Sequence, residues 1–277
     1  MKFFKPANLN DFFEITAKIK KNIYFLAGGT DINVQIKNNL LSEANIIFIN
    51  NLSELKGIYQ ENDQIVFGAL TTFRELINSS LVKKHLPLLS DNLQNFASPL
   101  IQTSATIGGN IANGSPTADI MPLLMILDAN LIIAGKAGSH QININDFYHG
   151  YKQNKLNKGE VIKEIRINRD ALTDVSTFYK KVGARKTLTI AKVTLAGLMK
   201  ITHGKIEQIN LAVGSLNEYA RRLPQLEAYL TGKTKQQINL EKLKTILAKE
   251  ITPISDLRSE KEYRFSVCLN LIRTFVE

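Results

Sequence analysis

The sequence has 277 residues, of which 44% are hydrophobic and 22% are charged, as is ordinary for a globular protein with an ample core. Its formal net charge is +10, but Lys and Arg are dispersed without a basic helix or aromatic-basic repeat, so we expect a solvated basic surface and no nucleic-acid partner, with an acidic partner or an anionic cofactor as the alternative. The sequence contains no apolar run of about 18 residues, so we expect no membrane-spanning helix. The start Met1–Pro6 is too short and too interrupted for a signal peptide, so we expect a cytoplasmic protein.

The first part of the chain alternates helix and strand. Apolar residues share one face of the segment that follows Asn8, and Asn8 with Asp11 resembles a capping box. This βαβ-like alternation predicts a first lobe that ends near residue 57. Its predicted elements are a helix over 8–20, a strand over Ile23–Ala27, an amphipathic stretch over about 32–40 and a strand over Ile46–Asn50.

A second lobe begins with a predicted strand over Gln64–Ala69. Thr72 and Glu75 form a capping-box pattern that opens a short helix. Further along, apolar periodicity predicts helices from Pro87 to about Ser98 and over 119–127, and strands near 130–134 and 161–168.

The pattern changes around Arg169–Val175. The residues after this point predict strands followed by helices, with His203-Gly204 as a tight hairpin turn. We therefore expect a separate α+β domain with a three-stranded antiparallel sheet. Its predicted strands are 176–183, 189–202 and 205–214, and its predicted helices are 218–230, 234–249 and 259–276.

The residues that commonly bind metals are few. Cys268 is the single cysteine and lies among apolar positions of the last predicted helix, which favours a small buried hydrophobic side chain. One cysteine cannot hold an iron–sulfur cluster alone, and the four histidines show no metal-ligand spacing. We predict no metal in this chain.

Two glycine-rich stretches, Leu26–Asp31 and Thr106–Asp119, are the most informative features. Adjacent glycines let the main chain approach a ligand and point N–H groups at oxygen acceptors. Neither stretch is a Walker A loop or a G-x-G-x-x-G motif. Each alone also fits a tight strand-to-helix turn. The pair, with hydroxyl and amide side chains at Thr30, Thr106 and Asn110, favours a cradle for a diphosphate.

Two aspartates accompany these stretches. A carboxylate repels a phosphate, so neither Asp31 nor Asp119 should touch a diphosphate directly. Each can accept a hydrogen bond from a ribose or ribityl hydroxyl, or cap a helix. The two roles are equally favoured for Asp31, and a ligand role is slightly favoured for Asp119.

At these residues the chain resembles the flavin-binding medium subunits of the molybdenum hydroxylases, which include xanthine dehydrogenase and carbon monoxide dehydrogenase. The loops of that family look like A-G-G-T-D and T-I-G-G-N-I-A-x-x-S-P-x-x-D, here Ala27–Asp31 and Thr106–Asp119. The resemblance covers nearly the whole chain. It continues through Pro122, Leu127-Asp128-Ala129, Phe147, Gly150-Tyr151, Lys181-Val182-Gly183-Ala184-Arg185-Lys186, Thr252–Ser259 and Glu262-Tyr263-Arg264.

The resemblance implies a fold and a cofactor. The expected fold is α+β, with a two-lobed FAD-binding domain of the PCMH type, similar to vanillyl-alcohol oxidase, over 1–172 (lobes about 1–57 and 58–172). A C-terminal domain like that of the CO dehydrogenase flavoprotein would occupy 173–277. FAD would be the only redox group, because the cysteine-bearing insertion of some relatives is missing. Many relatives have an arginine where this sequence has Ala184, and an acidic residue where it has Thr189. The family's charges around the flavin are therefore not assigned to this chain.

The resemblance also implies a binding site and no catalytic residue. The backbone of Leu26–Ile32 and Thr106–Asn110 would hold the FAD diphosphate, Asp119 would lie near the polar groups of the flavin, and Ile190 would cover one flavin face. The competing role of Ile162 is a buried position in a strand, and that of Lys181 is a charge on the surface. The competing role of Phe96 is a buried position on a helix. The implied cofactor-binding residues are Leu26, Ala27, Gly28, Gly29, Thr30, Asp31, Ile32, Phe96, Thr106, Gly109, Asn110, Asp119, Ile162 and Lys181.

The implied activity is electron transfer within a heteromeric oxidoreductase. A molybdenum-cofactor large subunit would oxidise the substrate, a small subunit with 2Fe-2S clusters would deliver electrons to FAD, and FAD would reduce NAD or another acceptor. A self-sufficient FAD-dependent reductase on the same fold is an alternative, but it needs a proton donor at a substrate site, and no Ser or Tyr plus Glu constellation stands out. A non-catalytic assembly subunit that has lost FAD is a further alternative. Both glycine stretches look intact, which argues against it.

Overall fold

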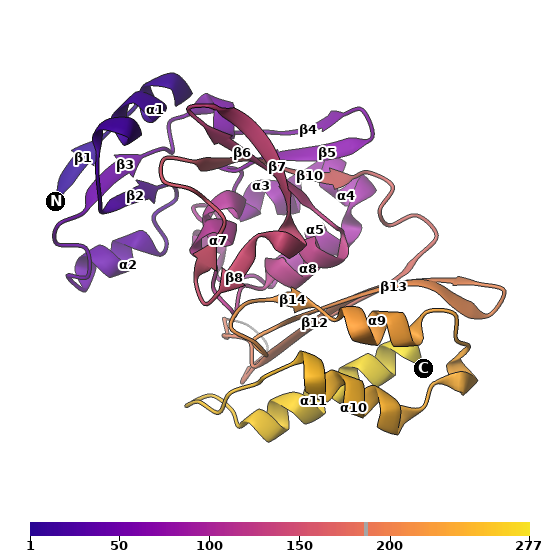
Figure 1. Cartoon of the computed structure of the whole chain (residues 1–277). Helices are drawn as coiled ribbons and strands as arrows, with labels where there is room; N and C mark the ends of the chain where they lie inside the picture. Colours follow the sequence, from indigo (N-terminus) through magenta and orange to yellow (C-terminus); the bar gives the residue numbers. More distant parts are fainter. Residues whose placement is uncertain (186–187) are drawn as a thin grey trace.

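The computed structural model describes residues 1–185 and 188–277 (Figure 1). Lys186, which belongs to one of the stretches that resemble the family, lies outside the described residues. The first lobe is a parallel sheet of order β1-β3-β2, with Ile47 of β3 paired to Phe4 and to Phe25. The predicted βαβ alternation is confirmed, and β1 is an additional strand. The elements are β1 (Lys2–Phe4), α1 (Leu9–Lys18), β2 (Ile23–Leu26), α2 (Ile32–Lys37) and β3 (Asn45–Phe48).

The second lobe is an antiparallel sheet of order β4-β5-β10-β6-β7 with helices packed on one side. The capping box at Thr72 and Glu75 is confirmed, since both of its hydrogen bonds form. The strands are β4 (Ile58–Glu61), β5 (Gln64–Gly68), β6 (Asn130–Gly135), β7 (Gly138–Asn143) and β10 (Val161–Asn168), with a small hairpin of β8 (Tyr148–Gly150) and β9 (Gln153–Asn154). The helices are α3 (Phe73–Asn78), α4 (Ser80–His85), α5 (Pro87–Leu93), α6 (Pro99–Gln102), α7 (Ile107–Asn113) and α8 (Ile120–Ile126), and short 3-10 turns cover Ser53–Leu55 and Ile144–Asp146.

The second glycine stretch is helical where a loop was expected. Thr106 caps α7, because its hydroxyl accepts a hydrogen bond from the Gly109 N–H at 3.2 Å. The helix ends at Gly114, whose φ of +61° is the left-handed conformation of a helix C-cap. The predicted helix from Pro87 to Ser98 was too long, since α5 ends at Leu93.

The C-terminal part is an antiparallel sheet of order β11-β12-β13-β14. The tight turn is confirmed, because His203 and Gly204 have φ values of 51° and 75°. Within the described residues this sheet has a fourth short strand, β14, where a helix from 218 was predicted. Leu223 N–H bonds the Leu211 carbonyl at 2.9 Å, which keeps this segment on the sheet. The elements are β11 (Ser176–Val182), β12 (Val193–Thr202), β13 (Lys205–Gly214), β14 (Arg221–Arg222), α9 (Pro224–Leu230), α10 (Leu240–Glu250) and α11 (Lys261–Val276), with a 3-10 turn over Lys235–Gln237.

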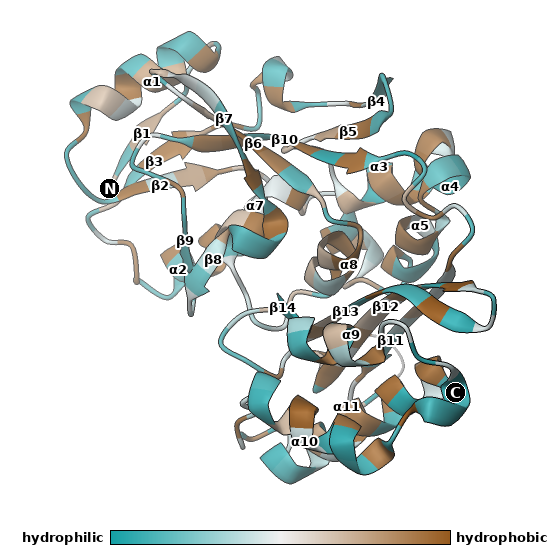
Figure 2. Cartoon of the chain, turned by 45° about the vertical axis from the view of Figure 1, so that its right-hand side comes forward, coloured by the Kyte–Doolittle hydropathy of each residue, from teal (hydrophilic) through white to brown (hydrophobic). Residues whose placement is uncertain are grey.

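Helix α8 joins the second lobe to the C-terminal sheet. All of its residues are buried, and Figure 2 shows this apolar helix between the second lobe and strands β12 and β13. Side chains of the sheet also bond to its end, since the Asn210 amide donates to the Ile126 carbonyl at 2.8 Å. Helices α9, α10 and α11 cover the other face of the sheet (Figure 1). Strand β10 ends at Asn168 and β11, in a different sheet, begins at Ser176; a domain boundary at 172/173 stays a prediction.

None of the helices in residues 1–185 and 188–277 has both the length and the apolar character that a membrane crossing requires.

Candidate functional site

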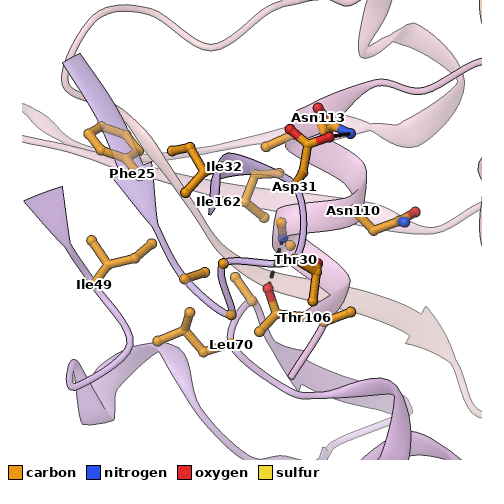
Figure 3. A pocket seen from close by; sticks show the side chains of 18 of the residues that line it. Phe25, Thr30, Asp31, Ile32, Ile49, Leu70, Thr106, Asn110, Asn113 and Ile162 are labelled. Atoms are coloured by element: carbon orange, nitrogen blue, oxygen red, sulfur yellow. Dashed lines mark hydrogen bonds between the residues drawn. The ribbon is translucent and has the colours of Figure 1, made fainter. Parts of the chain in front are cut away.

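A cavity of about 500 Å³ lies where the two lobes meet, and both glycine stretches line it (Figure 3). The first lobe contributes residues of β2 and the loop that follows, and the second lobe contributes α7 and Ile162 of β10. The predicted residues that line the cavity are Ala27, Gly28, Gly29, Thr30, Asp31, Ile32, Phe96, Thr106, Gly109, Asn110 and Ile162. Leu26, Asp119 and Lys181 are not among the described residues that line it.

Both glycines of the first stretch are required by geometry. A Cβ on Gly28 would lie 1.6 Å from the Ser104 carbonyl oxygen, so at this residue the main chains of the two lobes are in direct contact. Gly29 has a φ of +74°, in the region that favours glycine. The glycines therefore shape the loop by packing and conformation.

The two stretches differ in the state of their N–H groups. The N–H groups of Gly28–Ile32 make no hydrogen bond to another residue that the structure describes. In contrast, Ile107 donates to the Thr71 carbonyl, Gly108 to the Ala69 carbonyl, and Asn110 to the Thr106 carbonyl, at 2.8–2.9 Å. Successive free N–H groups form a concave anion site, and here only the first stretch offers them. The N–H groups of Ile107, Gly108, Gly109 and Asn110 are already used by tertiary contacts and the helix cap. That the backbone of Thr106–Asn110 holds a diphosphate stays a prediction.

Asn110 supplies a polar atom that has no partner. Its Oδ1 is buried without a hydrogen bond in the described part of the chain, although the residue lines the cavity. A buried polar atom without a partner costs stability. A bound molecule with a donor at this place would satisfy it.

Asp31 does not cap α2. Its side chain makes no capping hydrogen bond, so of its two equally favoured roles, capping is not observed. Instead Oδ2 accepts from Gln35 Nε2 at 2.5 Å and Oδ1 accepts from Asn113 Nδ2 at 3.4 Å. Figure 3 shows the carboxylate turned toward Asn113.

Asp119 and Lys181 meet each other at the domain junction. Lys181 Nζ lies 2.5 Å from Asp119 Oδ2, and the two side chains are only 15% and 12% exposed. A solvated surface charge was therefore the wrong alternative for Lys181, and Asp119 does not cap α8. Burial raises the pKa of the Asp119 carboxyl above its ordinary value, and the Lys181 charge opposes that rise. Oδ1 of Asp119 is buried without a partner among the described residues.

Three further predicted residues have different surroundings. The Phe96 ring stacks on Phe73 with centroids 3.8 Å apart and also lines the cavity. Ile162 is buried in β10 and lines the cavity, so the strand-core role and the site role coexist for it. Ile190 is 48% exposed.

Several lining residues were missed from the sequence. Asn113 lies inside the quoted second stretch, and its amide was the signal that could have identified it. Lys152 has a φ of 52° at the turn between β8 and β9, which no local pattern predicts. Other missed lining residues are Ile23, Tyr24, Phe25, Gln35, Ile49, Ala69, Leu70, Ile101, Ala105, Ala112, Leu156 and Val161.

The hairpin of β8 and β9 is joined to α7 by two hydrogen bonds. The Tyr148 hydroxyl donates to the Ile111 carbonyl at 2.6 Å, and the Asn154 amide donates to the Ala112 carbonyl at 3.0 Å. These bonds occupy carbonyls near the C-terminal end of α7. The end of the helix that carries Asn113 is therefore fixed.

The described residues contain no group of three or more His, Cys, Asp or Glu side chains that could hold a metal ion.

Comparison with known proteins gives consistent matches over both parts of the chain. Residues 1–169 match the family described as FAD binding domain in molybdopterin dehydrogenase, and residues 178–277 match the CO dehydrogenase flavoprotein C-terminal domain. The xanthine dehydrogenase FAD-binding subunit of Escherichia coli O157:H7 is 30% identical over 91% of this chain and 85% of its own length. The carbon monoxide dehydrogenase medium chain of Hydrogenophaga pseudoflava is 27% identical over 97% and 93%.

A solved structure agrees with these matches. Carbon monoxide dehydrogenase from Hydrogenophaga pseudoflava, in a form that lacks the Mo-pyranopterin moiety, superposes with a TM-score of 0.93 at 26% identity. The match covers 99% of this chain and 95% of that one.

Proposed function

The chain belongs to the family of FAD-binding domains in molybdopterin dehydrogenases, and on this premise we propose that it transfers electrons through FAD within a multi-subunit enzyme. The observation that carries the proposal is the loop Gly28–Ile32, whose N–H groups have no partner among the described residues and line a cavity between the lobes. The family makes this chain an FAD-dependent oxidoreductase subunit. The site residues, partners and electron acceptor are our proposals.

The described residues fit FAD at this cavity. The N–H groups of Gly28–Ile32 would bind the anionic oxygens of the diphosphate. Asn110 Oδ1, now without a partner in the described residues, would accept a hydrogen bond from the cofactor. The apolar side chains of Ile162 and Phe96, which line the same cavity, would exclude water from it.

The chain orients the cofactor, and the cofactor carries the redox chemistry. When bound, FAD can accept electrons singly and release them as a hydride. No residue of the chain needs to act as an acid or a base for that exchange. Asp119 and Lys181, which pair outside the described cavity lining, would fix the C-terminal sheet against the FAD-binding lobes.

We propose that the partners are a molybdenum-cofactor large subunit and a 2Fe-2S small subunit, and that NAD or another acceptor takes the electrons. The names of the relatives support this, since they are called a medium chain and an FAD-binding subunit. A basic net charge of +10 favours docking of acidic surfaces. A cytoplasmic location is part of the same proposal.

The first experiment tests the cofactor and the acceptor together. The purified chain is mixed with FAD, desalted, and its visible spectrum is recorded before and after anaerobic addition of NADH. We expect flavin bands that persist through desalting and are bleached by NADH. Retained FAD without bleaching would leave the electron-transfer role and exclude NAD as the acceptor. A colourless protein would contradict FAD binding by the isolated chain and favour the assembly subunit.

Turnover separates the remaining alternative. A self-sufficient reductase would oxidise NADPH with an organic substrate in the absence of other subunits. We expect no such turnover. Co-purification with the two proposed partner subunits would instead support the electron-transfer role.

A further inference from the structure

Asp31 places a negative charge in the cavity proposed for a diphosphate. The residue directly precedes α2 and lies within the loop Gly28–Ile32, whose N–H groups make no bond to another described residue. An aspartate at such a position usually accepts hydrogen bonds from nearby N–H groups of the first helical turn. Here its carboxylate makes no capping bond. The backbone of Asp31 is already helical, with φ −105° and ψ −51°, and its carboxylate bonds to other groups.

Two neutral amides bind the carboxylate. Gln35 Nε2 donates to Oδ2 at 2.5 Å, and Asn113 Nδ2 donates to Oδ1 at 3.4 Å (Figure 3). The two donors come from different lobes, because Gln35 belongs to α2 and Asn113 ends α7. All three residues line the same cavity.

The position of Asn113 is fixed by the rest of the fold. The left-handed Gly114 ends α7 directly after it. The Ala112 carbonyl accepts from the Asn154 amide at 3.0 Å, and the Ile111 carbonyl accepts from the Tyr148 hydroxyl at 2.6 Å. The amide of Asn113 is thus presented from a rigid helix end, so little conformational entropy is lost when it bonds to Asp31.

The carboxylate would compete with the diphosphate if it were released. An anion is attracted to free N–H groups, and an anion of the same chain is always present at high effective concentration. Near a bound diphosphate, it would also raise the energy of the complex by like-charge repulsion.

We propose that Gln35 and Asn113 are positioning residues, which hold the Asp31 carboxylate away from the Gly28–Ile32 N–H groups and so keep these groups free for the FAD diphosphate. The inference rests on the proposed function, because it needs FAD in this cavity. In this proposal Asp31 does not bind the cofactor. Its carboxylate would compete with the diphosphate for the N–H groups, and the two amides prevent this.

The test is a double-mutant cycle on FAD affinity, measured by flavin fluorescence on the apo chain. Asn113→Ala and Gln35→Ala should each weaken FAD binding about two- to fivefold, the scale expected for an exposed charged contact. Asp31→Ala should bind FAD as tightly as the wild type or more tightly. In the Asp31→Ala background, Asn113→Ala should have no further effect, because the competitor is gone.

Two controls accompany the cycle. Gln208→Ala makes the same change as Gln35→Ala at an exposed position of β13, and it should leave the affinity unchanged. Added salt should reduce the loss caused by Asn113→Ala, since salt screens exposed charges.

Opposite outcomes overturn the inference. If Asp31→Ala alone weakens binding, the carboxylate is a ligand of the cofactor. If the effects of Asp31→Ala and Asn113→Ala simply add, no restraint exists. Both results leave FAD binding by the wild type intact, whereas a wild type that binds no FAD would contradict the inference and the proposed function together.

Discussion

Lys181 Nζ lies 2.5 Å from Asp119 Oδ2 and thereby connects strand β11 to the residue that precedes α8. The pair is mostly buried, and the Tyr179 hydroxyl donates to the Asp119 carbonyl at 3.1 Å beside it. Helix α8 packs between the second lobe and the C-terminal sheet, so this ion pair lies at the contact between these two parts of the chain.

Lys181→Met should destabilise the protein more than the double variant Asp119→Asn/Lys181→Met. Removal of the lysine leaves a buried carboxylate unpaired, which costs about 3 kcal/mol of unfolding free energy, whereas the double variant has no charge at these two positions. Chemical denaturation of the three proteins measures the difference. Equal losses in both variants would mean that the pair contributes nothing as a pair.

The stability contributed by Asp119 should depend on pH. Burial raises the pKa of this carboxyl in the fold, so the folded state binds the proton more tightly than the unfolded state. Its contribution is therefore greatest below the unfolded pKa and is lost as the pH rises through the folded pKa. The unfolding free energy of the wild type relative to Asp119→Asn should fall as the pH is raised from below the unfolded pKa through the folded pKa. The opposite trend would show that the Lys181 charge dominates.

Gly28→Ala should separate the lobes at the cavity. The new Cβ would lie 1.6 Å from a main-chain oxygen of the other lobe, which cannot rotate away, so we expect a loss of about 3 kcal/mol or more. Gly109→Ala is the matched control, because its Cβ would meet only the Thr106 hydroxyl, at 2.7 Å. That variant should lose about 1 kcal/mol at most. Thermal unfolding of the apo proteins compares them.

Tyr148→Phe should loosen α7 without leaving a cavity. It removes the hydroxyl that bonds the Ile111 carbonyl, and an unpaired buried carbonyl costs about 1–2 kcal/mol. Burial raises the pKa of the Tyr148 phenol, so the variant and the wild type should give the same phenolate absorbance while the exposed tyrosines titrate. Tyr151→Phe, at a residue that is 57% exposed, should leave stability unchanged.

Arg264→Met should destabilise the segment before α11. The guanidinium is buried, pairs with Asp256 Oδ1 at 2.8 Å, and donates to the carbonyls of Lys192 and Ser215 at 3.0 Å. Losing these bonds should cost about 3 kcal/mol. Arg258→Met, at a side chain that is 51% exposed, should stay within about 0.5 kcal/mol of the wild type. Urea denaturation tests both variants.

The ion pair between Asp256 and Arg264 should make stability depend on pH. Burial favours a higher pKa for its carboxyl, but the Arg258 N–H and the Arg264 guanidinium outweigh it and lower the pKa below the ordinary value. The contribution of Asp256 to stability is therefore present above its unfolded pKa and lost as the pH falls through the folded pKa. The gap between wild type and Asp256→Asn should close upon acidification, as followed by thermal unfolding across the acid range.

Local sequence predicted much of the fold. The capping box at Thr72, the hairpin at His203-Gly204 and the alternation of the first lobe follow from residue types close in sequence, and the structure confirms them. Helix α7 was missed because two glycines and an asparagine disfavour a helix locally. Its first turn forms through the Thr106 cap and through the Thr71 and Ala69 carbonyls, which lie far back along the chain.

The candidate site was predictable only in part. The glycine stretches identified the cavity, because their backbone geometry is a local property. Which N–H groups remain free was not predictable, since that depends on carbonyls of the other segments. The contacts of Asn113 with Asp31 and of Asp119 with Lys181 were missed for the same reason: the two residues of each pair are distant in sequence, and the packing of lobes and domains brings them close.

The contact between Gly28 and Ser104 imposes an unequal constraint on its two residues. Gly28 touches the carbonyl oxygen of Ser104, a group that every amino acid carries. This contact therefore places no demand on the side chain of residue 104, whereas any Cβ at residue 28 would collide with that oxygen. Engineered changes of cofactor affinity should therefore leave position 28 untouched, because its main chain is the point at which the two lobes touch.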